Sequence, residues 1–364
     1  MDDHQIAFII CTNNKVMLDE CLMYISLLKV PDGFMTDVIT IEGAESMCAG
    51  YNAAMNESPA KYKIYMHQDV YITDRNFLIR LLDVFRSDDG IGMVGLVGAP
   101  QLDRHAIMWE MPRVGNLMTE KIDHMDYGFH PGEIIDVDCV DGLLMATQYD
   151  LTWRDDILEG YDFYDVSQSF EFHKKGYRVV VRDIDNDRVI HDDGVLNMFG
   201  WEKWRQIFIK EYKDMLDPVD YRKTHGLETG EEHWKYLYDH RDEYLSIFKD
   251  ATDFMDRVIK GNDFTMYELF IRMVSDQSSV CEKSDTVVKL YHIAQIVMKE
   301  REKAQQDFLS DVNSVKEAMD KYQITRQMIM RQILGLSGPY KKEADRYLES
   351  EVSDTAYRMI RERM

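Results

Sequence analysis

Short apolar runs alternate with longer amphipathic stretches through the first half of the chain. Residues 6–11 are all apolar and end in the polar turn Thr12-Asn13-Asn14, a pattern that predicts a buried strand. Similar runs predict strands at 37–41, 63–67, 93–98, 134–137, 143–147 and 177–182, with helices at 16–28, 46–56, 76–85 and 163–175. Because strands and helices alternate, we expect an α/β domain built on a mostly parallel sheet.

One stretch of the first half, residues 100–131, has no regular pattern of apolar and polar positions. It separates two of the expected strands. A long irregular segment inside an α/β domain commonly forms part of a ligand site or its lid. We therefore expect residues 100–131 to be a loop beside the site.

The second half of the chain follows a helical pattern. Strand patterns fade after about residue 199, and between 287 and 336 most positions spaced by three or four residues are apolar. This spacing predicts one long helix or two packed helices, which either complete a bundle or form a homodimer contact. We therefore divide the chain into an α/β domain, 1–215, and an all-helical C-terminal domain, 216–364, a candidate for oligomerisation or acceptor binding.

The net charge of the 364-residue chain is −23, and this excludes one class of partner. A strongly acidic surface repels phosphate backbones, so we expect no nucleic-acid partner. A nucleotide ligand remains compatible with this charge, because a bound divalent cation reverses the local field.

Location and redox state follow from other features of the sequence. The chain has no apolar run of about 18 residues, the length that a membrane helix needs, and we expect no transmembrane segment. It begins Met1-Asp2-Asp3-His4, which lacks the positive charge of a targeting leader, so we expect a cytoplasmic protein. Its five cysteines are scattered, which predicts buried thiols rather than disulfides or a zinc cluster.

The strand expected at 63–67 runs directly into His67-Gln68-Asp69. This places polar side chains at the carboxyl end of a strand, where open α/β sheets bind ligands. Alternate residues share a face, so His67 and Asp69 are candidates to bind one cation. A carboxylate suits Mg²⁺ or Mn²⁺, and an imidazole shifts the preference towards Mn²⁺. The alternative is an aspartate that only caps the following turn.

Four other segments carry candidate chemistry, each with a plain structural alternative. Asn52 lies on the helix before that strand and either faces a nucleotide pocket or packs on the sheet. Asp141-Gly142 forms a simple turn or allows a ligand to approach the backbone closely. Asp165 stands near a helix start, where it either caps the helix or accepts a proton from a substrate hydroxyl. His191 ends a strand and is either a metal ligand or structural.

The order of these segments resembles that of family-2-like glycosyltransferases with the GT-A fold. The resemblance covers about residues 5–200. His67-Gln68-Asp69 stands where most members carry Asp-x-Asp, a form associated with a divergent subgroup. The resemblance implies a Rossmann-like nucleotide-binding domain with a mixed, mostly parallel sheet.

The resemblance also implies an activity, an inverting transfer of sugar from a nucleoside-diphosphate sugar to an acceptor hydroxyl. We expect a UDP-sugar as donor and a glycan or glycoprotein as acceptor. Asp165 would be the catalytic base, and Asp69, His191 and His67 would bind Mn²⁺ or Mg²⁺. The implied donor-binding residues are Cys11, Thr12, Asn13, Asn14, Asn52, His67, Gln68, Asp69, Asp141 and Gly142.

Two other functions are compatible with an α/β domain of this kind. A sugar-1-phosphate nucleotidyltransferase usually carries a Gly-rich basic loop after the first strand, where this chain has Thr12-Asn13-Asn14-Lys15. A non-catalytic scaffold would keep the fold and act through its helical C-terminal part. Loss of metal-dependent nucleoside diphosphate release in Asp69→Ala would exclude the scaffold.

Overall fold

The structure is a computed structural model that describes residues 1–119, 124–127, 132–182, 189–191 and 201–224. All of these residues belong to one compact unit. The domain boundary expected at 215 stays a prediction. Nearly all of the expected C-terminal domain, including the helices at 287–336 and their homodimer contact, lies outside the described residues.

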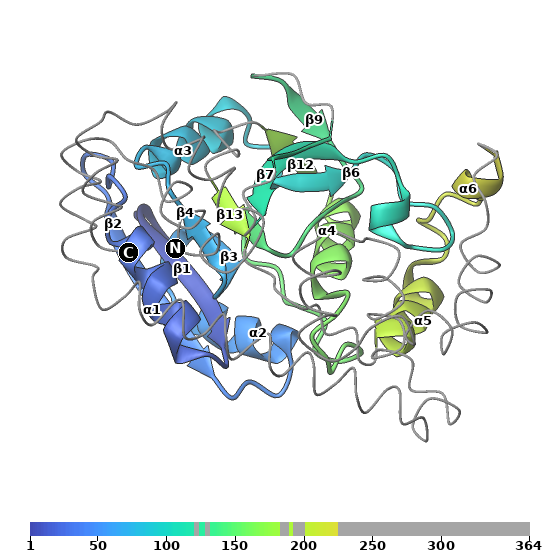
Figure 1. The fold of residues 1–364 in the computed structure, drawn as a ribbon, viewed down its shortest axis with the longest axis horizontal. Coiled ribbons are helices and arrows are strands. Elements are labelled where there is room, and N and C mark those ends of the chain that lie inside the picture. Colours follow the sequence, from blue (N-terminus) through green and yellow to red (C-terminus); the bar gives the residue numbers. More distant parts are fainter. Residues whose placement is uncertain (120–123, 128–131, 183–188, 192–200, 225–364) are drawn as a thin grey trace, which may run out of the picture. The chain divides into compact units, whose positions relative to one another are not determined.

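A seven-stranded sheet forms the centre of the unit (Figure 1). Strand β1 pairs in parallel with β2 and β3, and β12 pairs in parallel with β5, whereas β11 and β9 run against their neighbours. The expectation of a mixed, mostly parallel sheet is therefore confirmed. In spatial order the strands are β2 (Met35–Glu42), β1 (Asp2–Thr12), β3 (Ala60–His67), β11 (Leu144–Thr147), β5 (Ile91–Gly95), β12 (Arg178–Arg182) and β9 (Ile134–Asp136).

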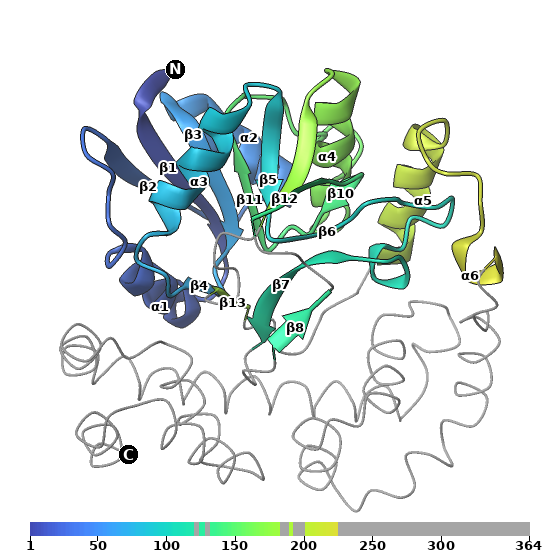
Figure 2. The same cartoon turned by 90° about the horizontal axis from the view of Figure 1, so that it is seen from above.

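Helices cover both faces of this sheet (Figure 2). Tyr62 and Tyr65 point to opposite faces of β3, because side chains alternate along a strand. Phe85 of α3 packs on Tyr62 at 5.7 Å between ring centroids, and Tyr51 of α2 packs on Tyr65 at 5.0 Å. The helices are α1 (Lys15–Ile25), α2 (Met47–Glu57), α3 (Phe77–Ser87), α4 (Tyr164–Lys174), α5 (Trp201–Tyr212) and α6 (Tyr221–Thr224), with a 3₁₀ turn at Met108–Glu110.

A second, six-stranded sheet adjoins the carboxyl end of β3. It consists of β10 (Cys139–Val140), β6 (Val97–Ala99), β7 (Val114–Thr119), β13 (Val189–His191) and β4 (Val70–Ile72), with β8 (His124–Asp126) paired to β7. The chain crosses from the first sheet to the second at Leu96, so the single strand expected at 93–98 is two strands, β5 and β6.

The expectation that 100–131 is irregular was wrong, because β7 and β8 lie within it. Strand β7 pairs with β6 on one side and with β13 on the other, and β13 is distant in sequence. Pairing with remote strands, rather than local alternation of apolar residues, therefore defines this element.

Helix α4 ends as its sequence predicts. Gly176 adopts a left-handed conformation with φ of 81°, and the Tyr177 amide donates to the Phe172 carbonyl at 3.1 Å. Glycine at this position closes a helix without steric cost. This turn leads directly into β12.

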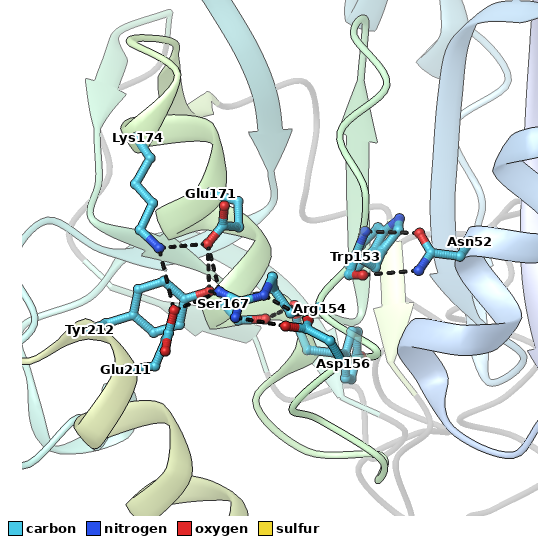
Figure 3. Close-up of polar contacts among 10 residues, drawn as sticks. Asn52, Trp153, Arg154, Asp156, Ser167, Glu171, Lys174, Glu211 and Tyr212 are labelled. Atoms are coloured by element: carbon cyan, nitrogen blue, oxygen red, sulfur yellow. Dashed lines mark hydrogen bonds and ion pairs between the residues drawn. The ribbon is translucent and has the colours of Figure 1, made fainter.

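A charged network joins α4 to α5 (Figure 3). Arg154 Nη1 donates to Glu171 at 3.2 Å and to Glu211 at 2.9 Å, and Tyr212 Oη donates to Glu171 at 2.8 Å. Because the guanidinium contacts carboxylates from both helices, the network fixes the orientation of α4.

None of the helices among the described residues has both the length and the apolar character needed to span a bilayer.

Candidate active site

Three side chains suited to metal binding meet beside the carboxyl end of β3. Strand β3 ends at His67, the turn carries Asp69, and β13 places His191 opposite Val70 of β4. His67 Nδ1 lies 3.8 Å from Asp69 Oδ1, and His191 Nε2 lies 3.7 Å from the same oxygen. One potential ligand atom from each residue falls within 4.8 Å of the other two. The structure thus brings together the three residues expected to bind metal.

The chemistry of this group fits a divalent cation. Two ligands about 2.1 Å from one ion stand about 3 to 4 Å apart, which matches the two separations. Asp69 Oδ1 is buried and accepts no hydrogen bond from the part of the chain that the structure describes. Burial and the neighbouring His191 lower the pKa of His67 against the opposing effect of Asp69, and the resulting neutral imidazole is the form that binds metal.

One other partly buried group of this kind occurs among the described residues, formed by Asp103, His105 and Asp220. Arg104 already pairs with Asp220 at 3.0 Å, and Asp103 accepts the amides of His105 and Tyr221. Because a guanidinium supplies the positive charge there, the first group is the better metal site.

The acidic–glycine turn at 141–142 contacts the first turn of α4. The Gly142 amide donates to Asp165 Oδ2 at 2.9 Å, and the Val166 amide donates to Asp165 Oδ1 at 2.8 Å. Asp141 Oδ1 accepts the Leu143 amide at 3.1 Å. The two segments predicted separately from the sequence therefore form one unit, in which backbone amides orient the Asp165 carboxylate.

Asp165 has the proton affinity that a base requires near neutral pH. Burial and the neighbouring Asp141 raise the pKa of Asp165 to about 7, against the opposing effect of the amides of Val166 and Gly142. A carboxylate with this pKa is ionised for part of the time at pH 7 and holds a proton well once it accepts one.

A family comparison identifies the domain that carries these groups. The model of the glycosyltransferase-like family matches residues 7–212, which is more than half of the chain. The chain belongs to the glycosyltransferase-like family. The matched range contains the metal-binding candidates, the 141–142 turn and Asp165.

Comparisons with individual proteins add little to this assignment. A search of curated proteins gives no match. Among solved structures, the chain is similar to the mannosyltransferase PcManGT from Pyrobaculum calidifontis in complex with GDP-Man and Mn²⁺, at 13% identity and a TM-score of 0.36, covering 98% of this chain and 85% of that one. It is also similar to A197 from STIV, at 10% identity and a TM-score of 0.32, covering 51% and 84%. Similarity at this level is too low to assign a donor or a metal.

The turn after β1 is tied to the metal-binding candidates through Gln68. Its Oε1 accepts from the Thr12 hydroxyl at 2.7 Å and from the amides of Asn13 and Asn14 at 3.0 and 2.9 Å, and its Nε2 donates to Asn13 Oδ1 at 2.7 Å. Gln68 was expected to contact the donor. In this structure its amide group holds the turn Thr12-Asn13-Asn14, beside which the donor base is expected. Cys11 pairs with His67 across β1 and β3, and burial raises the pKa of its thiol to about 12.

The structure gives Asn52 a different role from the one expected. Its Nδ2 donates to the Trp153 carbonyl and its Oδ1 accepts the Trp153 amide, both at 2.9 Å (Figure 3). The side chain is only 8% exposed. Both of its polar atoms thus join α2 to the segment after β11. The expectation that Asn52 faces the nucleotide stays a prediction.

Sequence reasoning missed one residue beside the metal-binding candidates, Tyr164. Its hydroxyl contacts His67 Nε2, and the residue is 4% exposed. Burial raises the pKa of Tyr164 well above its usual value, so the phenol is neutral. The aromatic run Phe163-Tyr164 in front of Asp165 was visible in the sequence, but its partner on β3 follows only from the fold.

Proposed function

We propose that this domain transfers a sugar, with inversion, from a nucleoside-diphosphate sugar to an acceptor hydroxyl. The proposal rests on the proximity of His67, Asp69 and His191 beside the carboxyl end of β3. All three lie in the part of the chain that the glycosyltransferase-like family model matches. The GT-A arrangement, with the nucleotide across the strand ends, belongs to this proposal.

His67, Asp69 and His191 would hold a Mn²⁺ or Mg²⁺ ion. When bound, such an ion supplies positive charge against the diphosphate leaving group. The buried Asp69 oxygen that lacks a hydrogen bond among the described residues is the observation that supports this role. Both histidines would serve as neutral ligands, which suits Mn²⁺ better than Mg²⁺.

Asp165 would act as the base. Its carboxylate accepts the proton of the acceptor hydroxyl while that oxygen bonds to the anomeric carbon, and the bond from this carbon to the diphosphate oxygen breaks on the opposite face. A single displacement inverts the configuration and requires no covalent glycosyl-enzyme. The Gly142 amide holds Asp165 in place throughout, because it bonds to one carboxylate oxygen.

The donor and acceptor are proposed only by class. We expect a UDP-sugar, with its base beside the turn Thr12-Asn13-Asn14, and a glycan or glycoprotein acceptor. Gln68 supports this assignment by fixing the turn through hydrogen bonds to all three of its residues. A cytoplasmic location stays a prediction from the sequence, which fluorescence imaging of the tagged protein would test.

A thermal-shift panel tests the proposal. Purified protein is heated with UDP-, GDP-, and dTDP-sugars, each with Mn²⁺ and with EDTA. We expect one donor class to raise the melting temperature only with metal, because ligands that bind the native state stabilise it. No stabilisation by any donor in either condition would contradict the proposal.

The donor that stabilises the protein then serves in a transfer assay. We expect Asp165→Asn to keep the donor-induced shift and to lower transfer by about 10²- to 10⁴-fold, the usual effect of removing a general base. An unchanged transfer rate in Asp165→Asn would overturn the assignment of the base.

A further inference from the structure

The two ring nitrogens of His67 face different groups. Nδ1 lies 3.8 Å from Asp69 Oδ1, on the side of the candidate metal site. Nε2 contacts the Tyr164 hydroxyl at the start of α4. The His67 ring therefore lies between Asp69 and the helix that carries Asp165.

This arrangement dictates the protonation of the ring if His67 binds metal. A neutral imidazole has one lone pair and one N–H. Binding through Nδ1 places the hydrogen on Nε2, and that N–H then donates to the Tyr164 oxygen. Metal-bound histidines commonly donate their second nitrogen in this way, which fixes ring orientation and tautomer.

The Tyr164 hydroxyl is held in place by its surroundings. Its ring packs on Tyr51 at 5.8 Å and on Trp153 at 6.3 Å between centroids. On the other side lies Gly142, where a Cβ atom would come within 2.1 Å of the hydroxyl oxygen. The absence of a side chain at Gly142 thus leaves the space that the hydroxyl occupies.

We propose that Tyr164 is a positioning residue that holds His67 in its metal-binding tautomer. The inference rests on the metal site of the proposed function. Tyr164 is the residue before Asp165 in α4, and Gly142 lies against both. The lack of a side chain at Gly142 leaves room for the Tyr164 hydroxyl, and the Gly142 amide donates to the Asp165 carboxylate. The same helix turn therefore sets the orientation of a metal ligand and that of the base.

The test is a Mn²⁺ titration followed by the electron paramagnetic resonance signal of free Mn²⁺, with and without UDP. Tyr164→Phe removes the hydroxyl and keeps the ring. We expect it to weaken Mn²⁺ binding by about 10- to 100-fold, the usual effect of losing a hydrogen-bond partner of a metal ligand. Asp69→Ala serves as the reference for loss of the site.

Tyr51→Phe is the matched control. Tyr51 belongs to the same aromatic cluster, and its buried hydroxyl has no hydrogen-bond partner among the described residues. We expect Tyr51→Phe to bind Mn²⁺ as the wild type does. Melting temperatures of both variants identify any loss of folding, and circular dichroism confirms that each titrated sample is native.

The outcomes separate this inference from the proposed function. Equal Mn²⁺ affinity in Tyr164→Phe and Tyr51→Phe, with binding lost in Asp69→Ala, would overturn the role of Tyr164 and leave the metal site. Wild-type protein that binds no Mn²⁺ in either condition would overturn both. Weaker binding only in Tyr164→Phe, together with no transfer from any sugar nucleotide, would support the inference and contradict the proposed transferase.

Discussion

Asp165 combines a raised pKa with a fixed position. Its two carboxylate oxygens accept backbone amides, which favour the ionised form, while burial and Asp141 oppose ionisation more strongly. Because the pKa of the Asp165 carboxyl lies near 7, a small change in its surroundings changes the ionised fraction at neutral pH.

The first prediction concerns pH. Only the ionised carboxylate accepts a proton, so kcat/KM should rise with pH through about 7 and become level above it. Asp141→Asn removes a negative neighbour and should move this inflection to lower pH. A pH–rate profile of both proteins measures the shift, and an inflection that stays in place would contradict the coupling between the two carboxylates.

The second prediction concerns Gly142. A Cβ atom there would come within 2.1 Å of the Tyr164 hydroxyl and 3.0 Å of the Asp165 Cβ. Gly142→Ala should lower the free energy of unfolding by about 1 to 3 kcal/mol, the usual cost of overpacking. It should also displace both side chains and weaken Mn²⁺ binding. Urea unfolding and Mn²⁺ titration measure the two effects, and wild-type values in both would contradict the close packing.

At the scale of elements, the segments that carry the site are fixed by contacts between elements that are far apart in sequence. The turn after β1 depends on Gln68 after β3, and α2 is joined to the segment after β11 by Asn52. Helix α4 is attached to α5 through Arg154 (Figure 3). These contacts hold the segments that carry the site in place.

The third prediction distinguishes such a role for Asn52 from donor binding. Asn52→Ala removes two buried hydrogen bonds and leaves the Trp153 amide and carbonyl without their partner. The free energy of unfolding should fall by about 2 to 4 kcal/mol, from the cost of buried unpaired polar groups. The KM for the donor should stay within about twofold, measured below the melting temperature of the variant. A large rise in KM with unchanged stability would restore the donor-binding role.

Elements defined by a local sequence pattern could be predicted, whereas those defined by pairing with distant strands could not. The apolar run of β1, the strand before His67 and the glycine that ends α4 are local features, and the sequence predicts them. Strand β7 pairs with β6 and with the distant β13, and it was missed. Strand β8, which pairs with β7, was missed with it. The same distinction explains why the contact of Asn52 with Trp153 and that of Tyr164 with His67 were not predicted, since each joins residues about 100 positions apart.

At the scale of the whole molecule, two sheets bring the candidate ligands together. Strand β3 of the first sheet ends at His67, and the second sheet supplies β4 and β13, whose antiparallel pairing sets His191 beside Asp69. The order of motifs along the sequence predicted these three residues as ligands. Their proximity in space follows only from the structure, in which the chain passes from the first sheet at His67 to the second sheet at β4. The family match covers the same part of the chain.

The most direct test of the account is the release of nucleoside diphosphate from the donor that stabilises the protein. Release is measured with Mn²⁺ and with EDTA, in the wild type and in Asp69→Ala. We expect release by the wild type that EDTA abolishes and that Mn²⁺ restores, with Asp69→Ala inactive in both conditions. Release that continues in EDTA, or that is undiminished in Asp69→Ala, would contradict it.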